Sequence, residues 1–184
     1  MTMFLTAAKS NGREGRVIAV RTKDGGKAWS FQSFVTPEPE GNDYAIMPST
    51  VQLDSKTILT AVRYRKFIDL FRSDDGGLTW QNAGRPAPET GGNPPSMIRL
   101  KDGRLAMTYG YRLKPFGIRA RLSSDQGKTW SDEIVLRDDG GSWDLGYPRT
   151  VQRRDGKLVS VYYYNTAANA ERFIGATIWQ APKA

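Results

Sequence analysis

The sequence predicts an all-β protein assembled from repeated four-stranded antiparallel units, and three observations support this prediction. The pattern [Ser/Thr]-x-Asp-x-Gly-x-x-Trp occurs three times, and its aspartates, Asp24, Asp75 and Asp125, lie 51 and then 50 residues apart. Each copy lies between runs rich in β-branched and aromatic residues. No stretch indicates a helix. A fixed period of roughly 20–50 residues is typical of a solenoid, a propeller or an array.

Each copy of this pattern is expected to form a hairpin turn. Its aspartate can accept hydrogen bonds from nearby backbone N–H groups, and its glycine supplies a positive φ without a Cβ clash. The tryptophan then re-enters the sheet, where it can pack against a neighbouring unit. We therefore interpret these turns as structural.

The eight-residue pattern resembles the Asp-box, or BNR repeat, of sialidase-like β-propellers, and the resemblance covers most of the chain. It implies an all-β, sialidase-like propeller of about three and a half four-stranded antiparallel blades, similar to the C-terminal half of such a propeller. We expect residues 1–184 to form one partial propeller, with units at approximately 3–35, 47–84, 94–136 and 147–180.

The strands of each unit are predicted from β-rich runs that are bounded by turn residues. Unit one is followed by a loop at 36–46, and unit four has neither an Asp-box nor a fourth strand. The predicted strands are 3–8, 16–21 and 30–35 in unit one; 50–53, 58–65, 68–72 and a short strand after Trp80 in unit two; 96–100, 105–112, 118–122 and 133–136 in unit three; and 149–153, 158–164 and 173–179 in unit four.

Composition limits the chemistry that the chain can perform. Its 184 residues include no cysteine and no histidine. Disulfides, thiolate chemistry and the commonest zinc ligand are therefore excluded, and catalysis must use Asp, Glu, Tyr, Arg, Lys or Ser. No cofactor and no metal site are predicted, although oxygen ligands in acidic loops would suit calcium or magnesium.

The net charge of +8, from 27 basic and 19 acidic residues, fits a nucleic acid, an anionic substrate or a solvated basic surface. The basic residues are scattered, so a nucleic-acid partner is not expected. No stretch approaches the roughly 18 apolar residues of a membrane span, so no membrane partner is expected. Residues 1–9 lack the basic start of a signal peptide. A cytoplasmic chain is therefore expected, whereas full-length relatives can be secreted.

Functional residues are expected at one end of the units. With the strands of a unit labelled A to D, the A–B and Asp-box turns lie on one face of an up-and-down propeller. The B–C and D–A connections lie on the other, which we call the mouth. Unit four carries Tyr147-Pro148-Arg149 where the other units carry Pro94-Pro95-Ser96 and Met47-Pro48-Ser49. The scaffold requires neither this tyrosine nor this arginine, so both indicate function.

Arginines at the mouth predict an anionic substrate, because a guanidinium can bind a carboxylate or a phosphate through two parallel hydrogen bonds. The alternative is that long arginines flank strand ends for solubility. The candidate substrate-binding residues are Arg63, Arg65, Arg112 and Arg149, together with Tyr111.

The resemblance to sialidases implies a tyrosine nucleophile just before the A strand of the last blade, and Tyr147 occupies that place. It also implies a glutamate that takes the phenol proton and an arginine cluster that binds the substrate carboxylate. Glu89 is the candidate partner of Tyr147, and Asp144 is a further candidate catalytic carboxylate. The family's N-terminal arginine and its acid/base aspartate belong to early blades that have no counterpart in this sequence.

Three functions remain open from the sequence. The first is a hydrolase that acts on an anionic substrate at the mouth, by resemblance a sialidase-like glycosidase, or one with altered ester or phosphoester hydrolysis. The second is a non-catalytic module that binds carbohydrate or protein. The third, nucleic-acid binding, rests on charge alone.

A second copy of the chain is expected to complete the ring as a homodimer. Sialidase-like propellers have six blades, whereas this sequence holds about three and a half. An open row would expose the B strand of unit one and the C strand of unit four, and exposed edges and apolar faces promote association. A two-fold axis would close both gaps and give six to eight blades.

Overall fold

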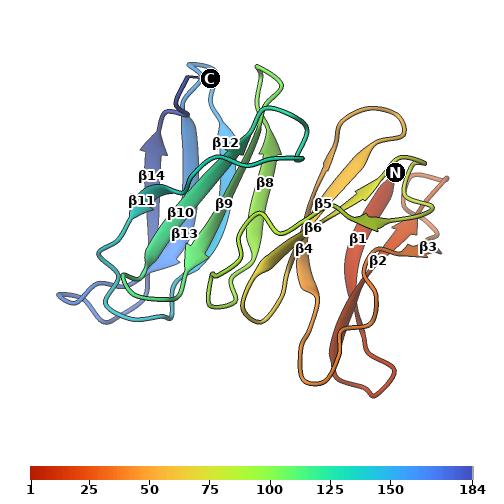
Figure 1. The fold of residues 1–184 in the computed structure, drawn as a ribbon, viewed down its shortest axis with the longest axis horizontal. Helices are drawn as coiled ribbons and strands as arrows, with labels where there is room; N and C mark the ends of the chain where they lie inside the picture. The colour runs from red at the N-terminus through yellow and green to blue at the C-terminus, as the bar shows by residue number, and fades with distance from the viewer. Residues whose placement is uncertain (184) are drawn as a thin grey trace.

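The computed structural model describes residues 1–183, and all of their regular structure is β. Four antiparallel sheets lie side by side in sequence order, from β1–β3 at one end of the row to β12–β14 at the other (Figure 1). No helix among residues 1–183 has the length and the apolar character needed to cross a membrane. The predicted all-β fold is therefore confirmed.

We number the sheets 1 to 4 in chain order. Sheet 1 contains β1 (Thr2–Ala8), β2 (Glu14–Arg21) and β3 (Ser30–Phe34); sheet 2 contains β4 (Ile46–Gln52), β5 (Ile58–Arg63), β6 (Ile68–Ser73) and β7 (Gln81–Asn82); sheet 3 contains β8 (Pro95–Arg99), β9 (Leu105–Tyr111), β10 (Gly117–Ser123) and β11 (Ile134–Arg137); and sheet 4 contains β12 (Gly146–Gln152), β13 (Leu158–Tyr164) and β14 (Phe173–Trp179). Neighbours in the chain are neighbours in each sheet.

The predicted strands differ from the observed ones mainly at the starts of β4 and β12. Both strands begin earlier than expected, because Ile46 pairs with Arg63 and Gly146 pairs with Tyr163 ahead of a register shift. In each case the shift contains an X-Pro step, which a regular ladder would not accommodate. Two equivalent β-bulges therefore lie at the mouth.

The core consists of apolar layers between consecutive sheets. Strands β5 and β6 of sheet 2 are buried at nearly every position, because sheets 1 and 3 cover both of their faces. Strand β14 of sheet 4 instead alternates between exposed and more buried residues. A sheet with one covered face shows this alternation. Only sheets 2 and 3 are thus enclosed on both sides within residues 1–183.

The Asp-box turns have the predicted geometry. Asp75 accepts hydrogen bonds from the backbone N–H groups of Leu78 and Thr79, both at 2.9 Å. Asp24 accepts from the N–H groups of Lys27 and Ala28 in the same way. The prediction that these aspartates bind backbone amides is therefore confirmed.

The tryptophans of the second and third boxes connect neighbouring sheets, as predicted. Trp80 donates through Nε1 to the Ser33 hydroxyl of sheet 1 at 3.1 Å, and its ring meets Phe4 edge-on at 5.6 Å. Trp130 packs against the core between sheets 2 and 3. These turns therefore fix the spacing of the sheets.

The two ends of the sheets carry different connections, as expected. The A–B turns and the Asp-box turns of sheets 2 and 3 lie at the upper end in Figure 1, and the B–C and D–A connections lie at the lower end. The lower end is the mouth. Residues 36–45, 83–94 and 138–145 bring it long loops from three D–A connections.

We predict that Asp125→Ala destabilises the fold in a pH-dependent manner. Hydrogen bonds from Thr129 and Ser123 lower the pKa of Asp125 to about 2. The loss of such an acceptor costs about 1 kcal/mol, which lowers the thermal midpoint of a chain of this size by roughly 2–4 °C. Because the folded pKa is depressed, this stabilisation is present above the unfolded value of about 3.9 and is lost as the pH falls through about 2.

Thermal unfolding followed by circular dichroism at pH 7 and pH 2 measures this difference. The control is Asp132→Ala, which removes an exposed aspartate outside the turn. A constant difference between wild type and Asp125→Ala at both pH values would contradict the account.

Candidate functional site

Tyr147 lies in the β-bulge at the start of β12, at the mouth. Its backbone is left-handed, with a φ of 53°, a conformation that a residue with a side chain adopts only when its surroundings impose it. Met47 occupies the equivalent bulge in β4 and has a φ of 51°. Bulges of this kind re-aim side chains near functional sites.

Asn93 imposes the conformation of Tyr147. Its side chain is fully buried. Its Oδ1 accepts from the N–H groups of Tyr147 and Gly110, both at 3.1 Å, and its Nδ2 donates to the Leu145 carbonyl at 2.9 Å. A Cβ at Gly110 would overlap the Asn93 amide. The Asn93 side chain thus connects sheets 3 and 4 at the mouth.

Arg63, at the end of β5, reaches the Tyr147 hydroxyl from sheet 2. Its Nη1 donates to that hydroxyl at 3.0 Å, and its Nη2 donates to the Tyr44 hydroxyl at 3.1 Å. The residue is only 8% exposed, and its Nε is buried without a partner among residues 1–183. A buried guanidinium is costly unless an anion compensates its charge, and no carboxylate in the described part of the chain forms an ion pair with Arg63.

Arg112 approaches Tyr147 from sheet 3. Its Nη2 donates to the Tyr163 hydroxyl at 2.7 Å, and its Nε donates to the Leu145 carbonyl at 3.2 Å. The guanidinium carbons of Arg63 and Arg112 lie 5.8 and 5.7 Å from the centre of the Tyr147 ring. Tyr147 therefore lies near two positive charges.

Asp144 provides the negative charge nearest to this cluster. It accepts from the Tyr163 hydroxyl at 2.8 Å and forms an ion pair with Arg172 at 2.8 Å. The Tyr163 hydrogen bond, with help from Arg172, lowers the pKa of Asp144. Burial and the bond to Asp144 raise the pKa of Tyr163 to about 12. Asp144 is therefore a carboxylate and Tyr163 a neutral donor at pH 7.

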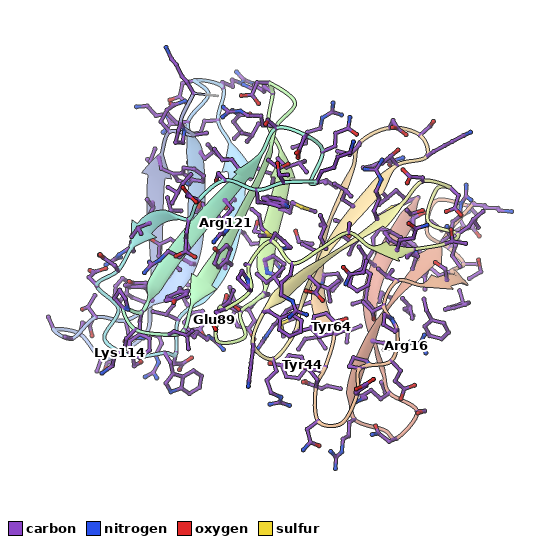
Figure 2. The ribbon with its side chains drawn as sticks, viewed as in Figure 1. Arg16, Tyr44, Tyr64, Glu89, Lys114 and Arg121 are labelled. Atoms are coloured by element: carbon purple, nitrogen blue, oxygen red, sulfur yellow. The ribbon has the colours of Figure 1, made fainter. Side chains whose placement is uncertain are left out.

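The structure brings together four of the residues that the sequence singled out, and a fifth lies next to them. Arg63, Arg112 and Asp144 surround Tyr147 and Tyr163 directly. Arg65 donates to the Asn42 carbonyl at 2.6 Å, and its guanidinium lies 4.8 Å from the Tyr44 ring, which is labelled in Figure 2. Arg65 thus contacts the cluster through Tyr44 rather than Tyr147.

The structure places three candidates elsewhere. Glu89, labelled in Figure 2, and Tyr111 line a hollow of about 320 Å³ with Tyr109, Arg121 and Glu133. Glu89 forms no hydrogen bond or ion pair to Tyr147, so it is not placed to take its proton. The guanidinium of Arg149 bonds the Pro148 carbonyl at 3.2 Å, and Arg149 lies on the exposed face of sheet 4.

Sequence reasoning missed Asn93, Tyr44, Tyr163 and Arg172. Asn93 stands in a loop, where nothing in the repeat indicates a buried amide. Tyr163 could have been found by aligning the B strands, where it is equivalent to Arg63 and Gly110. It also pairs in the sheet with Gly146, the residue before Tyr147. Tyr44 and Arg172 lie in or beside loops with no equivalent in other units.

The cluster suits an anionic ligand rather than a metal. Within residues 1–183 no group of three or more acidic side chains is placed to hold a metal ion. The guanidiniums of Arg63 and Arg112 can donate to a carboxylate or a phosphate. The hydroxyls of Tyr44 and Tyr147 can also donate, because both accept from Arg63 and keep their own hydrogen. Trp143, with the Arg112 guanidinium 5.4 Å from its ring, adds an exposed aromatic surface at the edge.

Comparison with known proteins identifies the kind of fold. A model of the family described as a BNR repeat-like domain matches residues 2–160. A Dyadobacter fermentans protein of unknown function is 28% identical and superposes with a TM-score of 0.82, over 98% of this chain and 50% of that one. No curated protein matches the chain.

Two further solved structures share the fold at lower identity. An alpha-L-arabinanase from Penicillium chrysogenum, complexed with arabinobiose, is 18% identical with a TM-score of 0.65, over 97% of this chain and 62% of that one. The Trypanosoma rangeli sialidase in complex with the inhibitor DANA is 15% identical with a TM-score of 0.63, over 96% of this chain and 29% of that one. The sialidase-like fold is confirmed, and the chain spans less than two thirds of each of these proteins.

We predict that Asn93→Ala destabilises the protein strongly. The change leaves the N–H groups of Tyr147 and Gly110 without their acceptor and removes one of the two donors to the Leu145 carbonyl, which costs roughly 2 kcal/mol or more. Chemical denaturation measures the loss. Asn169→Ala is the control, because Asn169 is exposed and its side chain accepts only from the Glu171 N–H. Equal stability of Asn93→Ala and wild type would refute the role of Asn93.

Proposed function

Because this chain belongs to the BNR repeat-like domain family, we propose that its mouth binds a sugar that carries a carboxylate and that Tyr147 acts there as the nucleophile of glycoside hydrolysis. Arg63 and Arg112 bind the carboxylate in this proposal. The proposal agrees with the resemblance to sialidases. It is also supported by the fold that the chain shares with a sialidase and an arabinanase.

The observation that carries the proposal is the uncompensated charge of Arg63. A guanidinium that is 8% exposed and bonds only neutral groups within residues 1–183 lacks the counter-charge that normally offsets its burial. A ligand carboxylate would supply that charge. The Tyr147 hydroxyl, bonded to the same guanidinium, would then lie beside the carbon that carries the carboxylate.

The chemistry proceeds in two displacements. In the first, the Tyr147 oxygen bonds to the anomeric carbon while the bond from that carbon to the leaving-group oxygen breaks. The leaving group departs with the electron pair and the phenol proton passes to solvent. In the second, a water oxygen bonds to the anomeric carbon while the bond from that carbon to the Tyr147 oxygen breaks. The tyrosine oxygen leaves with the electron pair and regains a proton from the attacking water, and the free sugar forms.

Neither candidate carboxyl group of this site is placed and protonated to donate a proton to the leaving group. Asp144 is held as a carboxylate by Tyr163 and Arg172, so it does not donate a proton at neutral pH. Glu89 lines a hollow whose lining does not include Tyr147. We therefore expect turnover of aryl glycosides, whose leaving groups need no proton, and little turnover of alkyl glycosides.

The same observation favours a second candidate, a module that binds anionic carbohydrate without hydrolysing it. Arginines, tyrosines and Trp143 suffice for binding, whereas natural glycosides need an acid to leave. Ester or phosphoester hydrolysis would use the same cluster for the anion. Turnover and binding must therefore be measured separately.

We predict that the chain hydrolyses an aryl sialoside and that Tyr147→Phe lowers turnover roughly 100-fold or more. The variant keeps the ring and its packing, so binding of the free sugar acid should change little. A fluorogenic assay with aryl sialosides, aryl phosphates and aryl esters measures turnover, and calorimetry measures binding. Wild-type binding without turnover would favour the binding module, and full turnover by Tyr147→Phe would reject Tyr147 as nucleophile.

We predict that Arg112→Ala weakens binding of a sialic acid roughly tenfold or more, because it removes a charge-assisted hydrogen bond. Binding of the methyl ester of the same sugar, which lacks the negative charge, should change much less. The control is Arg154→Ala, a basic residue at the opposite end of sheet 4. Equal losses for the acid and the ester would show that Arg112 supports the structure and does not bind the carboxylate.

A further inference from the structure

We propose that a second copy of this chain packs the outer face of its sheet 1 against the outer face of sheet 4, so that two copies close a ring. Each sheet has a leading face, turned toward the preceding sheet, and a trailing face, turned toward the following one. Within residues 1–183, the leading face of sheet 1 and the trailing face of sheet 4 are uncovered.

The trailing face of sheet 4 repeats positions that are packed in the other sheets. Three cross-strand pairs between A and B strands are equivalent: Val51–Leu59, Ile98–Ala106 and Val151–Val159. The first packs in the core between sheets 2 and 3, and the second in the core between sheets 3 and 4. Val151, by contrast, is 62% exposed.

The C strands show the same pattern. Ile68, Ile118 and Ile174 are equivalent, since each pairs with the matched residue of its B strand. Ile68 and Ile118 are fully buried, whereas Ile174 is 75% exposed. Sheet 4 therefore retains the apolar surface of an inner sheet on a face that no described residue covers.

The leading face of sheet 1 has the complementary character. Leu5 is equivalent to Val62, Tyr109 and Tyr162, which are buried in the other three sheets, but Leu5 is exposed. Phe31 and Phe34 lie beside it on the same face, in contact with each other at 4.9 Å and also exposed. Apolar surface of this extent marks an interaction site.

One uncovered face is a leading face and the other is a trailing face, and this difference favours a second copy of the chain as the partner. Every interface inside the chain joins a trailing face to a leading face. A second copy offers a leading face to sheet 4 and a trailing face to sheet 1, so a two-fold axis satisfies both ends.

Arg149, in sheet 4, is compatible with sheet 1 of a second copy as the next sheet. Between sheets 2 and 3, and again between sheets 3 and 4, the residue equivalent to Arg149 is a serine whose hydroxyl accepts a hydrogen bond from a backbone N–H in the A strand of the next sheet. Ser49 accepts from Met97 at 2.8 Å, and Ser96 accepts from Thr150 at 3.0 Å. Sheet 1 has no A strand within residues 1–183. Sheet 1 of a second copy would therefore present no A-strand N–H to sheet 4. Position 149 then needs no serine to accept it, and the long side chain of Arg149 has space.

The contact would also complete the wall of the mouth. Tyr147 and Tyr163 lie at the mouth end of sheet 4, and Tyr147 is 39% exposed. A sheet packed on that face would cover the open side of the site. This consequence rests on the proposed function, whereas the contact itself can be measured without any ligand.

The first measurement is the mass of the protein in dilute solution by light scattering. We expect twice the 20.5 kDa mass of one chain, because two such interfaces bury on the order of 2,000 Å² or more. A folded chain of 20.5 kDa at micromolar concentration would overturn the proposal. Larger open assemblies would overturn the two-fold closure.

Charge substitutions then test which faces meet. Ile174→Lys changes the trailing face of sheet 4, and Leu5→Glu changes the leading face of sheet 1. These two positions should face each other, because Ile68 packs with Tyr109 and Ile118 packs with Tyr162 at the equivalent places inside the chain. Each side chain is exposed in one chain, so each variant should fold, as circular dichroism can verify, and should have the mass of a single chain. The control is Val135→Lys, at a similarly exposed apolar position of β11, which should leave the doubled mass unchanged.

Mixing the two variants distinguishes head-to-tail pairing from pairing of like faces. In the mixture, one interface is native and the other brings a lysine opposite a glutamate, so the doubled mass should return. If sheet 4 packed on sheet 4, Leu5→Glu alone would keep the doubled mass and the mixture would restore nothing. That result would overturn the proposal.

Discussion

Face-to-face packing of consecutive sheets is the constraint on which the rest of this structure depends. One repeat unit cannot bury its apolar faces alone, so consecutive sheets pack against one another, and within residues 1–183 sheets 2 and 3 have a neighbour on both sides. Because side chains alternate along a strand, both sets of alternating residues in β5 and β9 must be compatible with a core, and both are buried. The Asp-box turns contribute to the same packing, since Trp80 bonds Ser33 of the previous sheet.

The fold was predictable from sequence because its determinants are local and repeated. The spacing of Asp24, Asp75 and Asp125 fixed the period, and each turn is held by hydrogen bonds within five residues. The bulges at Met47 and Tyr147 were not predictable, since an X-Pro step usually argues against a ladder. Their conformations depend on Thr6 and on Asn93, which are 41 and 54 residues away in sequence.

The site was predictable only in part, for the same reason. Comparison of the units singled out Tyr147, and the predicted ends of the B strands gave Arg63 and Arg112, because these repeat positions converge at the mouth. Loop residues follow no repeat, so the sequence could not show that Glu89 lines a hollow with Arg121 and Tyr109 or that Arg172 pairs with Asp144. Arg63 illustrates the limit well. It bonds a hydroxyl 84 residues away, and its burial without a counter-charge is visible only in the folded chain.

Met47 and Tyr147 stand in the same left-handed bulge of two different sheets, and Nη1 of Arg63 contacts both, at 3.2 Å from the Met47 sulfur and 3.0 Å from the Tyr147 hydroxyl. The backbone that presents a side chain to this guanidinium therefore exists at two places within residues 1–183. One copy carries a phenol and the other a thioether of similar reach. For the evolution of such a protein, this means that a different side chain can be brought to the mouth by a change at one residue, without a new loop, wherever duplication has already supplied the bulge.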